Sequence, residues 1–368
     1  MSDQKWTRRE FLRTSAASAA GLAAAMAAAR TAALAAEVDK AKILNYNEAM
    51  EYRPLGKTGL KVSAVCLGGH WKRMDTVVPG VFKQGGGWME VEPAKLADFD
   101  KNRADVLSRC IDAGINYVDA CAGHEVLAYG RALKGRRDKM YVGYSWYEKE
   151  MRFEPCRTAD ALLRSLDEGL KAAGLDHVDL WRITLLEQSG GHTKGEIEEA
   201  MKALESARKQ GKARFTGVSS HDRPHIKSII ETYPDLIDVV VTPYTADSKE
   251  LPADSLFEAV RKHNVGVFGI KPFASNSLFK GDSSLGSPTA AEDDKRARLA
   301  LRYILGNPAI TAPIPGLINA HQVDNAVAAV AERRKLDLAE RQELKAAMDE
   351  AWARLPGDYQ WLKQWEYV

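Results

Sequence analysis

Apolar residues gather in eight short runs along the chain, and a segment with the spacing of an amphipathic helix follows each run. Short, nearly continuous apolar runs are typical of strands that are buried on both faces. We therefore expect eight strands that alternate with helices. The predicted strands are Ser63–Gly68, Tyr117–Ala120, Met140–Tyr144, Val178–Thr184, Phe215–Ser220, Val239–Tyr244, Val265–Lys271 and Thr311–Gly316.

The helical pattern is clearest from Thr158 to Ala173. Leucines recur there at every fourth position from Leu162 to Leu170, Thr158 can cap the first turn, and Gly174 can end the helix. A second pattern runs from Glu196 to Gln210 and stops at Gly211. Both patterns predict helices with one buried face.

Strands that alternate with helices are typical of parallel βα units. Eight units in series favour closure into a barrel over an open, doubly wound sheet. Ahead of them, residues 52–62 predict two short strands around a glycine turn. The expected fold class is therefore α/β, a (β/α)8 TIM barrel with an N-terminal β-hairpin. We assign the barrel to residues 51–332, and a C-terminal helix with an aromatic tail packed on the barrel to residues 333–368.

The first 36 residues read as an export signal, because a basic start is followed by a weakly apolar, alanine-rich run. Thr7–Leu12 resembles the twin-arginine motif, and Ala33–Ala35 offers a cleavage site. An ordinary amphipathic helix is disfavoured, since an alanine-only run has almost no apolar face. We expect a twin-arginine signal peptide at residues 1–36, a linker at 37–50, the twin-arginine translocase as export partner, and a periplasmic protein.

The composition supports one large core, with 45% hydrophobic residues in a chain of 368. The whole chain carries a formal charge of +2, and residues 1–36 hold five basic and two acidic residues, so the remainder carries −1. Such a balance gives no indication of nucleic acid or of an anionic membrane as partner. Beyond the signal, no apolar stretch is long enough for a membrane span.

Export changes the interpretation of the four cysteines, because the periplasm permits disulfides. Their spacing matches no zinc or CxxC pattern. Cys66 and Cys110 lie in apolar patterns and are expected to be buried, inert thiols. Cys121 and Cys156 each follow a predicted strand, and the sequence leaves open whether they pair.

Two long loops should lie at the mouth of the barrel, where the carboxyl ends of the strands meet. They span residues 70–99 and 274–292. The first contains Trp71, Gly85–Gly87 and Trp88, which suits either a lid with aromatic substrate contacts or a surface elaboration.

The strand ends themselves supply reactive side chains. The C-terminal tail also carries Trp361, Trp365 and Tyr367, which could line a pocket at the mouth of the barrel or simply anchor the last segment. The strand-end candidates are His70, Asp119, Cys121, His124, Tyr144, Trp146, Thr184, Glu187, His221, Tyr244 and Lys271.

Two kinds of chemistry fit these side chains. His70, His124, Cys121 and Asp119 could ligate a transition metal, although their spacing is a weak signal and solvated or structurally bonded residues are the alternative. Lys271 could act as nucleophile or base if burial lowers its pKa. The competing interpretation of Lys271 is a salt bridge to Asp119 or Glu187.

Several blocks, in order, resemble the aldo-keto reductase family over most of the chain after the signal. Unrelated barrels would not match in this order. The blocks are Tyr52–Ser63, Ala113–Asp119, Arg131–Lys139, Gly211–Ser220, and Ile314–Pro315–Gly316 with Gln322.

This resemblance implies reduction of aldehydes or ketones with NADPH by a tyrosine acid, a lysine, a histidine and an aspartate. Asp119 occupies the aspartate position, but the loop after it has contracted and the tyrosine is missing. Ser145 stands at the lysine position and Thr184 at the histidine position. Tyr129 falls within the next helical pattern and is not assigned the acid's role. His124 could replace the lost tyrosine, because it is ionisable near neutral pH.

The resemblance also implies a nucleotide site that is only partly kept. Ser219 is retained, whereas Ser220 and Val241 replace the amide side chains that hold nicotinamide, and the stacking tyrosine of the seventh strand is absent. An intact turn at Gly316 could still bind phosphate. NADP is therefore an open possibility, as is a metal. The predicted cofactor-binding residues are Ser219, Ser220, Gly316, Gln322 and Asn325.

The leading hypothesis is a diverged aldo-keto reductase-like oxidoreductase that acts on a small carbonyl or sugar-like substrate in the periplasm. Its predicted catalytic residues are Asp119, His124, Lys271 and His70. A periplasmic enzyme has no evident pool of reduced nicotinamide, so a tightly bound cofactor would be needed. The alternatives are a nicotinamide-independent lyase, isomerase or hydrolase, possibly metal-assisted, and a non-catalytic periplasmic binding protein.

Overall fold

A computed structural model describes residues 40–87, 89–248, 255–332 and 335–363. The chain divides into two units, residues 1–46 and 47–368, and the second holds all the elements discussed below. The predicted signal peptide and Trp88, Trp365 and Tyr367 lie outside the described residues. No helix within the described ranges is both long and apolar enough to cross a bilayer.

The centre of the second unit is a seven-stranded parallel sheet in which neighbours in sequence are neighbours in space. This order confirms the βα alternation that the apolar runs predict. The strands are β3 (Tyr117–Ala120), β4 (Tyr141–Tyr144), β5 (Val178–Thr184), β6 (Ala213–Ser219), β7 (Val239–Pro243), β8 (Gly266–Ile270) and β9 (Ala312–Pro313).

Residues 64–68 close this sheet into the barrel. The amide of Cys66 donates to Pro313 O of β9 at 3.1 Å, and the amide of Leu67 donates to Tyr117 O of β3 at 3.0 Å. The predicted first strand therefore occupies the gap between the two edges, although only Leu67 and Val118 form a regular bridge. β9 is shorter than predicted because Pro313 and Pro315 have no N–H to donate to a neighbour.

The predicted hairpin consists of β1 (Tyr52–Pro54) and β2 (Lys61–Ser63), paired antiparallel. Its turn lies at the amino ends of the barrel strands, where the amide of Lys57 donates to Asn264 O at 2.7 Å. The hairpin thus covers the end of the barrel opposite the carboxyl ends of the strands.

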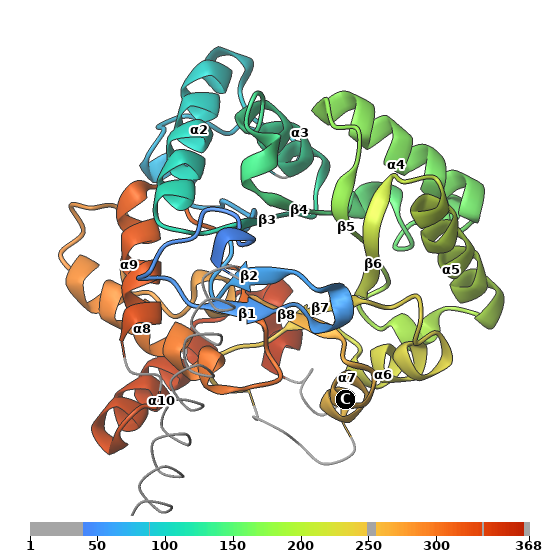
Figure 1. Cartoon of the computed structure of the whole chain (residues 1–368). Helices are drawn as coiled ribbons and strands as arrows, with labels where there is room; N and C mark the ends of the chain where they lie inside the picture. Colours follow the sequence, from blue (N-terminus) through green and yellow to red (C-terminus); the bar gives the residue numbers. More distant parts are fainter. Residues whose placement is uncertain (1–39, 88, 249–254, 333–334, 364–368) are drawn as a thin grey trace, which may run out of the picture. The chain divides into compact units, whose positions relative to one another are not determined.

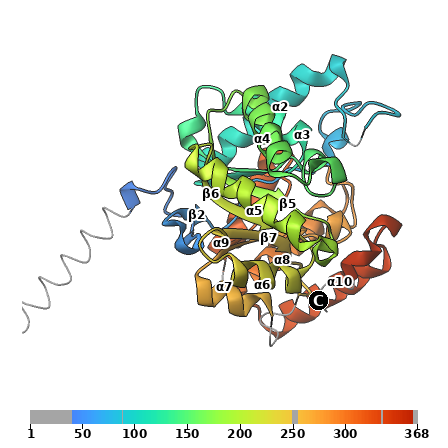
Figure 2. The ribbon, with the colours of Figure 1, turned by 90° about the vertical axis from the view of Figure 1, so that its right-hand side faces the viewer.

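Helices surround the sheet (Figures 1 and 2). Thr158 caps the helix predicted there and Gly174 ends it in a left-handed conformation, as expected. Thr193 and Glu196 form a capping box, so the next helix begins two residues earlier than predicted. The helices are α2 (Leu96–Asp112), α3 (Gly123–Ala132), α4 (Ala159–Ala173), α5 (Lys194–Lys209), α6 (Arg223–Thr232), α7 (Leu256–His263), α8 (Ala290–Gly306), α9 (Ala320–Ala331) and α10 (Leu338–Ala353).

After β9 and α9, the chain adds α10 and a short 3-10 helix, η9 (Gly357–Lys363). α10 packs on α8, and Arg302 of α8 donates to both carboxylate oxygens of Glu340, at 2.9 and 3.1 Å. Leu355 and Leu362 are buried in the apolar cluster beneath this segment. The last described residues are therefore fixed against the barrel.

Candidate active site

A cavity of about 430 Å³ lies at the carboxyl ends of the strands. Strand ends, both long loops and the C-terminal segment contribute to its wall. This volume suits a small-molecule ligand. Seven of the predicted strand-end candidates line the cavity, namely His70, Asp119, Cys121, Thr184, Glu187, His221 and Lys271.

Four other strand-end candidates lie outside the cavity lining. The Tyr144 hydroxyl donates to Ser165 O, and that of Tyr244 accepts from the Asn307 side chain at 2.8 Å, so both are bonded to helices or loops outside the strands. Trp146 packs beside Gly123, at the start of α3. The ring of His124 lies edge-on to Trp71, with ring centroids 6.2 Å apart. The structure thus does not bring His124 into the wall with Asp119.

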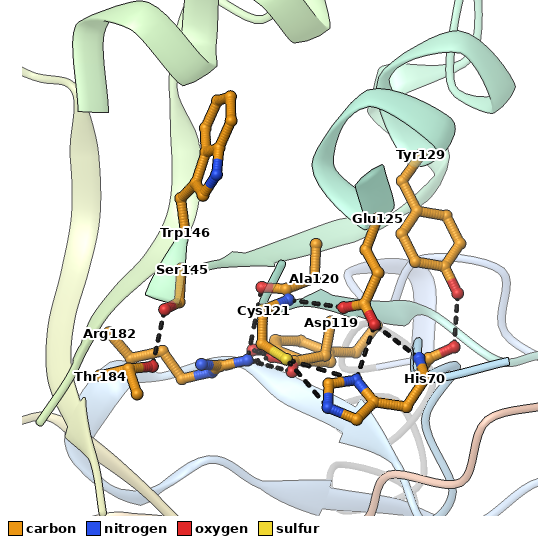
Figure 3. Close-up of polar contacts among 12 residues, drawn as sticks. His70, Asp119, Ala120, Cys121, Glu125, Tyr129, Ser145, Trp146, Arg182 and Thr184 are labelled. Carbon is orange, nitrogen blue, oxygen red and sulfur yellow. Dashed lines mark hydrogen bonds and ion pairs between the residues drawn. The ribbon is translucent and has the colours of Figure 1, made fainter. Parts of the chain in front are cut away.

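A buried ion pair forms the floor of the cavity (Figure 3). Arg182 of β5 reaches Asp119 at the end of β3, with its Nε donating to Oδ1 at 3.1 Å and its Nη2 to Oδ2. Both side chains are buried, Arg182 to 1% exposure. Burial alone would lower the pKa of Arg182, but the charge and hydrogen bonds of Asp119 raise it. Asp119 is therefore a paired carboxylate.

Next to this pair, Ser145, Thr184 and Glu150 form a closed polar network. The hydroxyls of Ser145 and Thr184 lie 2.7 Å apart, and Ser145 Oγ donates to Glu150 Oε2 at 2.5 Å. Glu150 also accepts from Thr184 N at 2.7 Å and from the Trp181 indole at 3.2 Å. Burial raises the pKa of Glu150, and these hydrogen bonds oppose that effect. The network fixes the ends of β4 and β5.

A second buried carboxylate ties the ends of two strands together. Glu125, in the first turn of α3, accepts from the amide of His70 at 2.5 Å and from the amide of Cys121 at 2.8 Å. Its Oε1 also lies 2.7 Å from His70 Nδ1. Burial acts to raise the pKa of Glu125, yet the charge and hydrogen bond of His70, with smaller contributions, lower it to about 2. A side chain at Gly69 would collide with this carboxylate, since its Cβ would lie 2.0 Å from Glu125 Cδ.

The predicted metal ligands come together only in part. His70 and Cys121 are neighbours, with Sγ 3.5 Å from Nδ1, and Glu125 completes a group whose ligand atoms lie within 4.8 Å of one another. Asp119 is paired with Arg182 instead, and His124 packs on Trp71. Both oxygens of Glu125 accept backbone hydrogen bonds, which explain this arrangement without an ion. A metal at His70 and Cys121 stays a prediction.

Lys271 follows β8 and lines the cavity with a left-handed backbone, φ 58°. The salt bridge suggested between Lys271 and Asp119 or Glu187 does not form. Asp119 pairs with Arg182 instead, and Glu187 pairs with Arg152 at 3.3 Å. Burial is the main cause that lowers the pKa of Lys271. His70 is also left-handed, with φ 59°. Backbone strain of this kind is concentrated at functional sites.

The aromatic residues near the first loop contribute to the core rather than to the cavity. Trp71 is 1% exposed, donates its indole N–H to Gly68 O at 3.0 Å and borders only an adjoining cavity, so its expected contact with a substrate stays a prediction. Tyr129 donates to the same oxygen at 2.6 Å, and burial raises its pKa well above the usual range. Tyr129 is therefore no replacement for the missing tyrosine, in agreement with its helical pattern.

The predicted cofactor residues fall into two groups. Ser219 and Gly316 line the main cavity, whereas Gly316, Gln322 and Asn325 line a second, adjoining one. Ser220 Oγ donates to Leu186 O at 3.0 Å and so holds a loop. Gln322 Oε1 accepts from Ile318 N at 3.0 Å. Asn325 Oδ1 accepts a hydrogen bond from Arg298 Nη1 at 2.6 Å, and Asn325 Nδ2 donates one to Asp294 O at 3.0 Å.

The second cavity has a mostly apolar wall that also carries a few polar groups. Arg73 lines it and donates to Gly281 O at 2.7 Å and to Ser283 Oγ at 2.8 Å, which joins the two long loops. His321 also lines it and bonds to Asp294 at 2.6 Å. The two cavities share lining residues, among them Lys72 and Gly316. A long ligand could therefore extend from one into the other.

Sequence reasoning missed Arg182, Glu125, Lys72 and Tyr359 as site residues. Arg182 had a local signal, because it alternates with Trp181 and Ile183 in a barrel strand and so points to the interior. Glu125 stands close to Asp119 in sequence, but its partners come from another strand end. No local signal connects Lys72 with Tyr359, which meet across the mouth.

The chain resembles known proteins along most of its length. A sequence model of the Aldo/keto reductase family matches residues 77–349. L-galactose dehydrogenase from Arabidopsis thaliana is 24% identical over 312 residues, which cover 78% of this chain and 91% of the relative. L-glyceraldehyde 3-phosphate reductase from Escherichia coli (strain K12) is 24% identical over 246 residues, 62% of this chain and 63% of that protein. A solved aldo-keto reductase from Bacillus halodurans, in its holo form, superposes with a TM-score of 0.56 at 23% identity, covering 81% of this chain and 96% of its own.

Proposed function

Because the chain belongs to the aldo/keto reductase family, we propose that it interconverts a small carbonyl compound of the sugar class with the corresponding alcohol. The observation that carries this proposal is the cavity of about 430 Å³, whose polar wall is built from the ends of several strands. Its size and its many donors suit a compact, hydroxyl-rich molecule. Two relatives are named for L-galactose and for L-glyceraldehyde 3-phosphate.

NADP(H) is the cofactor we propose. The residues fit its phosphate end, since Arg73, Ser283 and His321 offer a guanidinium, a hydroxyl and an imidazole group in the adjoining cavity. At the nicotinamide end, Ser219 lines the main cavity and Ser220 is engaged with a loop. When bound, the nicotinamide would donate or accept the hydride. The carboxylates Asp293 and Asp294 in the same wall are already bonded, to two loop amides and to His321.

The chain's own groups would hold and orient the substrate. The Arg182–Asp119 pair and the Ser145–Thr184 network give the floor a fixed polar surface. Asp119 keeps the aspartate of the usual tetrad, whereas Ser145 and Thr184 stand in place of its lysine and histidine, so we infer that the tetrad is degenerate. An acid must then come from elsewhere in the wall.

The decisive experiment measures nucleotide and turnover together in protein purified after export. We expect NADP(H) to be retained, or to bind on addition, as shown by its ultraviolet spectrum and by mass spectrometry. Oxidation of NADPH should then follow addition of small aldoses and glyceraldehyde 3-phosphate. If the protein neither binds NADP(H) nor turns over any of these compounds, the proposed function is wrong. Metal found by elemental analysis in protein without nucleotide would favour the nicotinamide-independent alternative.

We also propose that the twin-arginine route exports the protein to the periplasm. The support is the Thr7–Leu12 motif and the alanine-rich run that follows it. Arg8→Lys combined with Arg9→Lys should leave the protein in the cytoplasmic fraction. Lys5→Arg, a change that conserves the charge at a position outside the arginine pair, is the control and should not affect export. Export that persists in the double variant would contradict the proposal.

A further inference from the structure

The C-terminal segment brings a tyrosine into the wall of the cavity. η9 places Tyr359 and Trp361 there. Leu362 is 1% exposed and anchors the segment in the apolar cluster. The ring of Trp361 stacks on His221, with ring centroids 4.2 Å apart and planes 12° from parallel. Tyr359 is thus held at the mouth by the contacts of the two residues that follow Gln360.

Two ammonium groups face this tyrosine. Lys72 Nζ hydrogen-bonds to the Tyr359 hydroxyl and lies 3.2 Å from Ser275 Oγ. Lys271 Nζ lies 5.6 Å from the centroid of the Tyr359 ring. Three other carboxylates of the wall have partners of their own, Asp119 in Arg182, Glu187 in Arg152 and Glu125 in His70. The positive charge of the two lysines is therefore directed at the phenol.

This environment distinguishes Tyr359 from other tyrosines. Burial acts to raise its pKa, but the hydrogen bond from Lys72 and the charges of Lys271 and Lys72 outweigh it, so the pKa is lowered. Asp358 and Arg152 are further charged groups of the same wall. Five other tyrosines of the described chain have a shifted pKa, and in each it is raised: Tyr117, Tyr129, Tyr141, Tyr144 and Tyr147.

Other acids near the cavity are less suited to donate a proton. Burial and the charge of Glu125 raise the pKa of the Cys121 thiol well above its usual value. Burial, Lys271 and Arg152 lower the pKa of His221 well below its usual value, so that ring is neutral and has no acidic proton to give at neutral pH. Tyr147 has a pKa raised to about 12.

We propose that Tyr359, held by Lys72 and Lys271, is the proton donor of the reaction, an inference that rests on the proposed function. In the reducing direction the Tyr359 O–H bond breaks, and its proton forms the new O–H bond on the substrate oxygen. The carbonyl carbon accepts a hydride from a reduced nicotinamide in the same step. The resulting tyrosinate is stabilised by the Lys72 ammonium group and regains a proton from water.

The first test is a tyrosine titration of the full-length protein, followed by tyrosinate absorbance near 295 nm. The wild type should show one tyrosine that ionises at lower pH than the others, and Tyr359→Phe should remove that step. Tyr147→Phe, at a second tyrosine of the same wall, is the matched control and should keep it. Lys72→Met should shift the step to higher pH, and Lys72→Arg should largely preserve it. If Tyr359→Phe titrates like the wild type, the inference is wrong.

The second test is turnover. Tyr359→Phe should lower kcat/KM by about 10²- to 10⁴-fold, the range usual for a lost general acid. Tyr141→Phe, at a tyrosine of β4 that lines neither cavity, should leave kcat/KM nearly unchanged. Equal turnover of Tyr359→Phe and wild type would overturn the inference even if the titration differs. If the wild type has no nicotinamide-dependent turnover but the titration step is present, the proposed function fails while the lysine-held tyrosine stands.

Discussion

The floor and the rim of the cavity are built in opposite ways. The floor consists of groups at the ends of β3, β4 and β5 that satisfy one another, as in the Arg182–Asp119 pair and the Ser145–Thr184 contact. The rim consists of Lys72, Lys271 and Tyr359, which come from two loops and the C-terminal segment and face the cavity. The closed polar network therefore lies on the strands, whereas the groups suited to proton transfer lie on the segments that connect or follow them.

The largest effect on stability is expected when one side chain of the buried Arg182–Asp119 pair is removed. Arg182→Met would leave the Asp119 carboxylate buried without its cation, and should lower the free energy of unfolding by about 3–5 kcal/mol. Lys101→Met, which removes one partner of the exposed Lys101–Asp105 pair, is the control and should cost less than about 0.5 kcal/mol. Urea unfolding followed by circular dichroism measures both. Similar losses in the two variants would show that the floor is not a structural unit.

The second largest effect should come from Glu125, which joins floor and rim. Its pKa is lowered from 4.5 to about 2, so its ionised form stabilises the folded protein by about 3 kcal/mol above pH 4.5. This contribution should decline as the pH falls from 4.5 toward 2. Glu125→Gln should therefore be less stable than wild type at pH 7, and the difference should shrink across that interval. A difference that does not change with pH would contradict the assignment.

The smallest effect on stability should come from the rim. Trp361→Ala removes the ring that covers His221, and should cost less than about 1 kcal/mol because Trp361 is partly exposed. Loss of that cover should raise the pKa of His221, since burial is the main cause that lowers it. NMR titration of the imidazole signals measures the change, with His225 as internal control. An unchanged His221 would mean that Trp361 does not bury it.

Much of the barrel could be predicted from local pattern. The strands, the Thr158 cap and the Gly174 stop depend on residues close in sequence, and the structure confirms them. The burial of Cys66 and Cys110 is likewise confirmed, and burial raises the pKa of Cys110 to about 12. All four cysteines are free thiols in the structure, including Cys121 and Cys156.

The site was less predictable, because its chemistry depends on partners far apart in sequence. The sequence correctly predicts Asp119 as a cavity residue, but its partner Arg182 lies on another strand. His124 and Glu125 are adjacent, yet the first turn of α3 directs only Glu125 to the cavity wall. Lys72 and Tyr359 are brought together only when the C-terminal segment folds over the mouth.

The closure of the barrel has a consequence for biosynthesis. The amide of Gly68 donates to Pro315 O at 2.8 Å, and that of Cys66 to Pro313 O at 3.1 Å, so the closing strand waits for residues that are made much later in translation. At about 5–20 residues per second, a ribosome needs on the order of half a minute to reach them. The amino-terminal region therefore leaves the ribosome well before the barrel can close. A nascent chain passes through a long interval in which both edges of the sheet are open to chaperones.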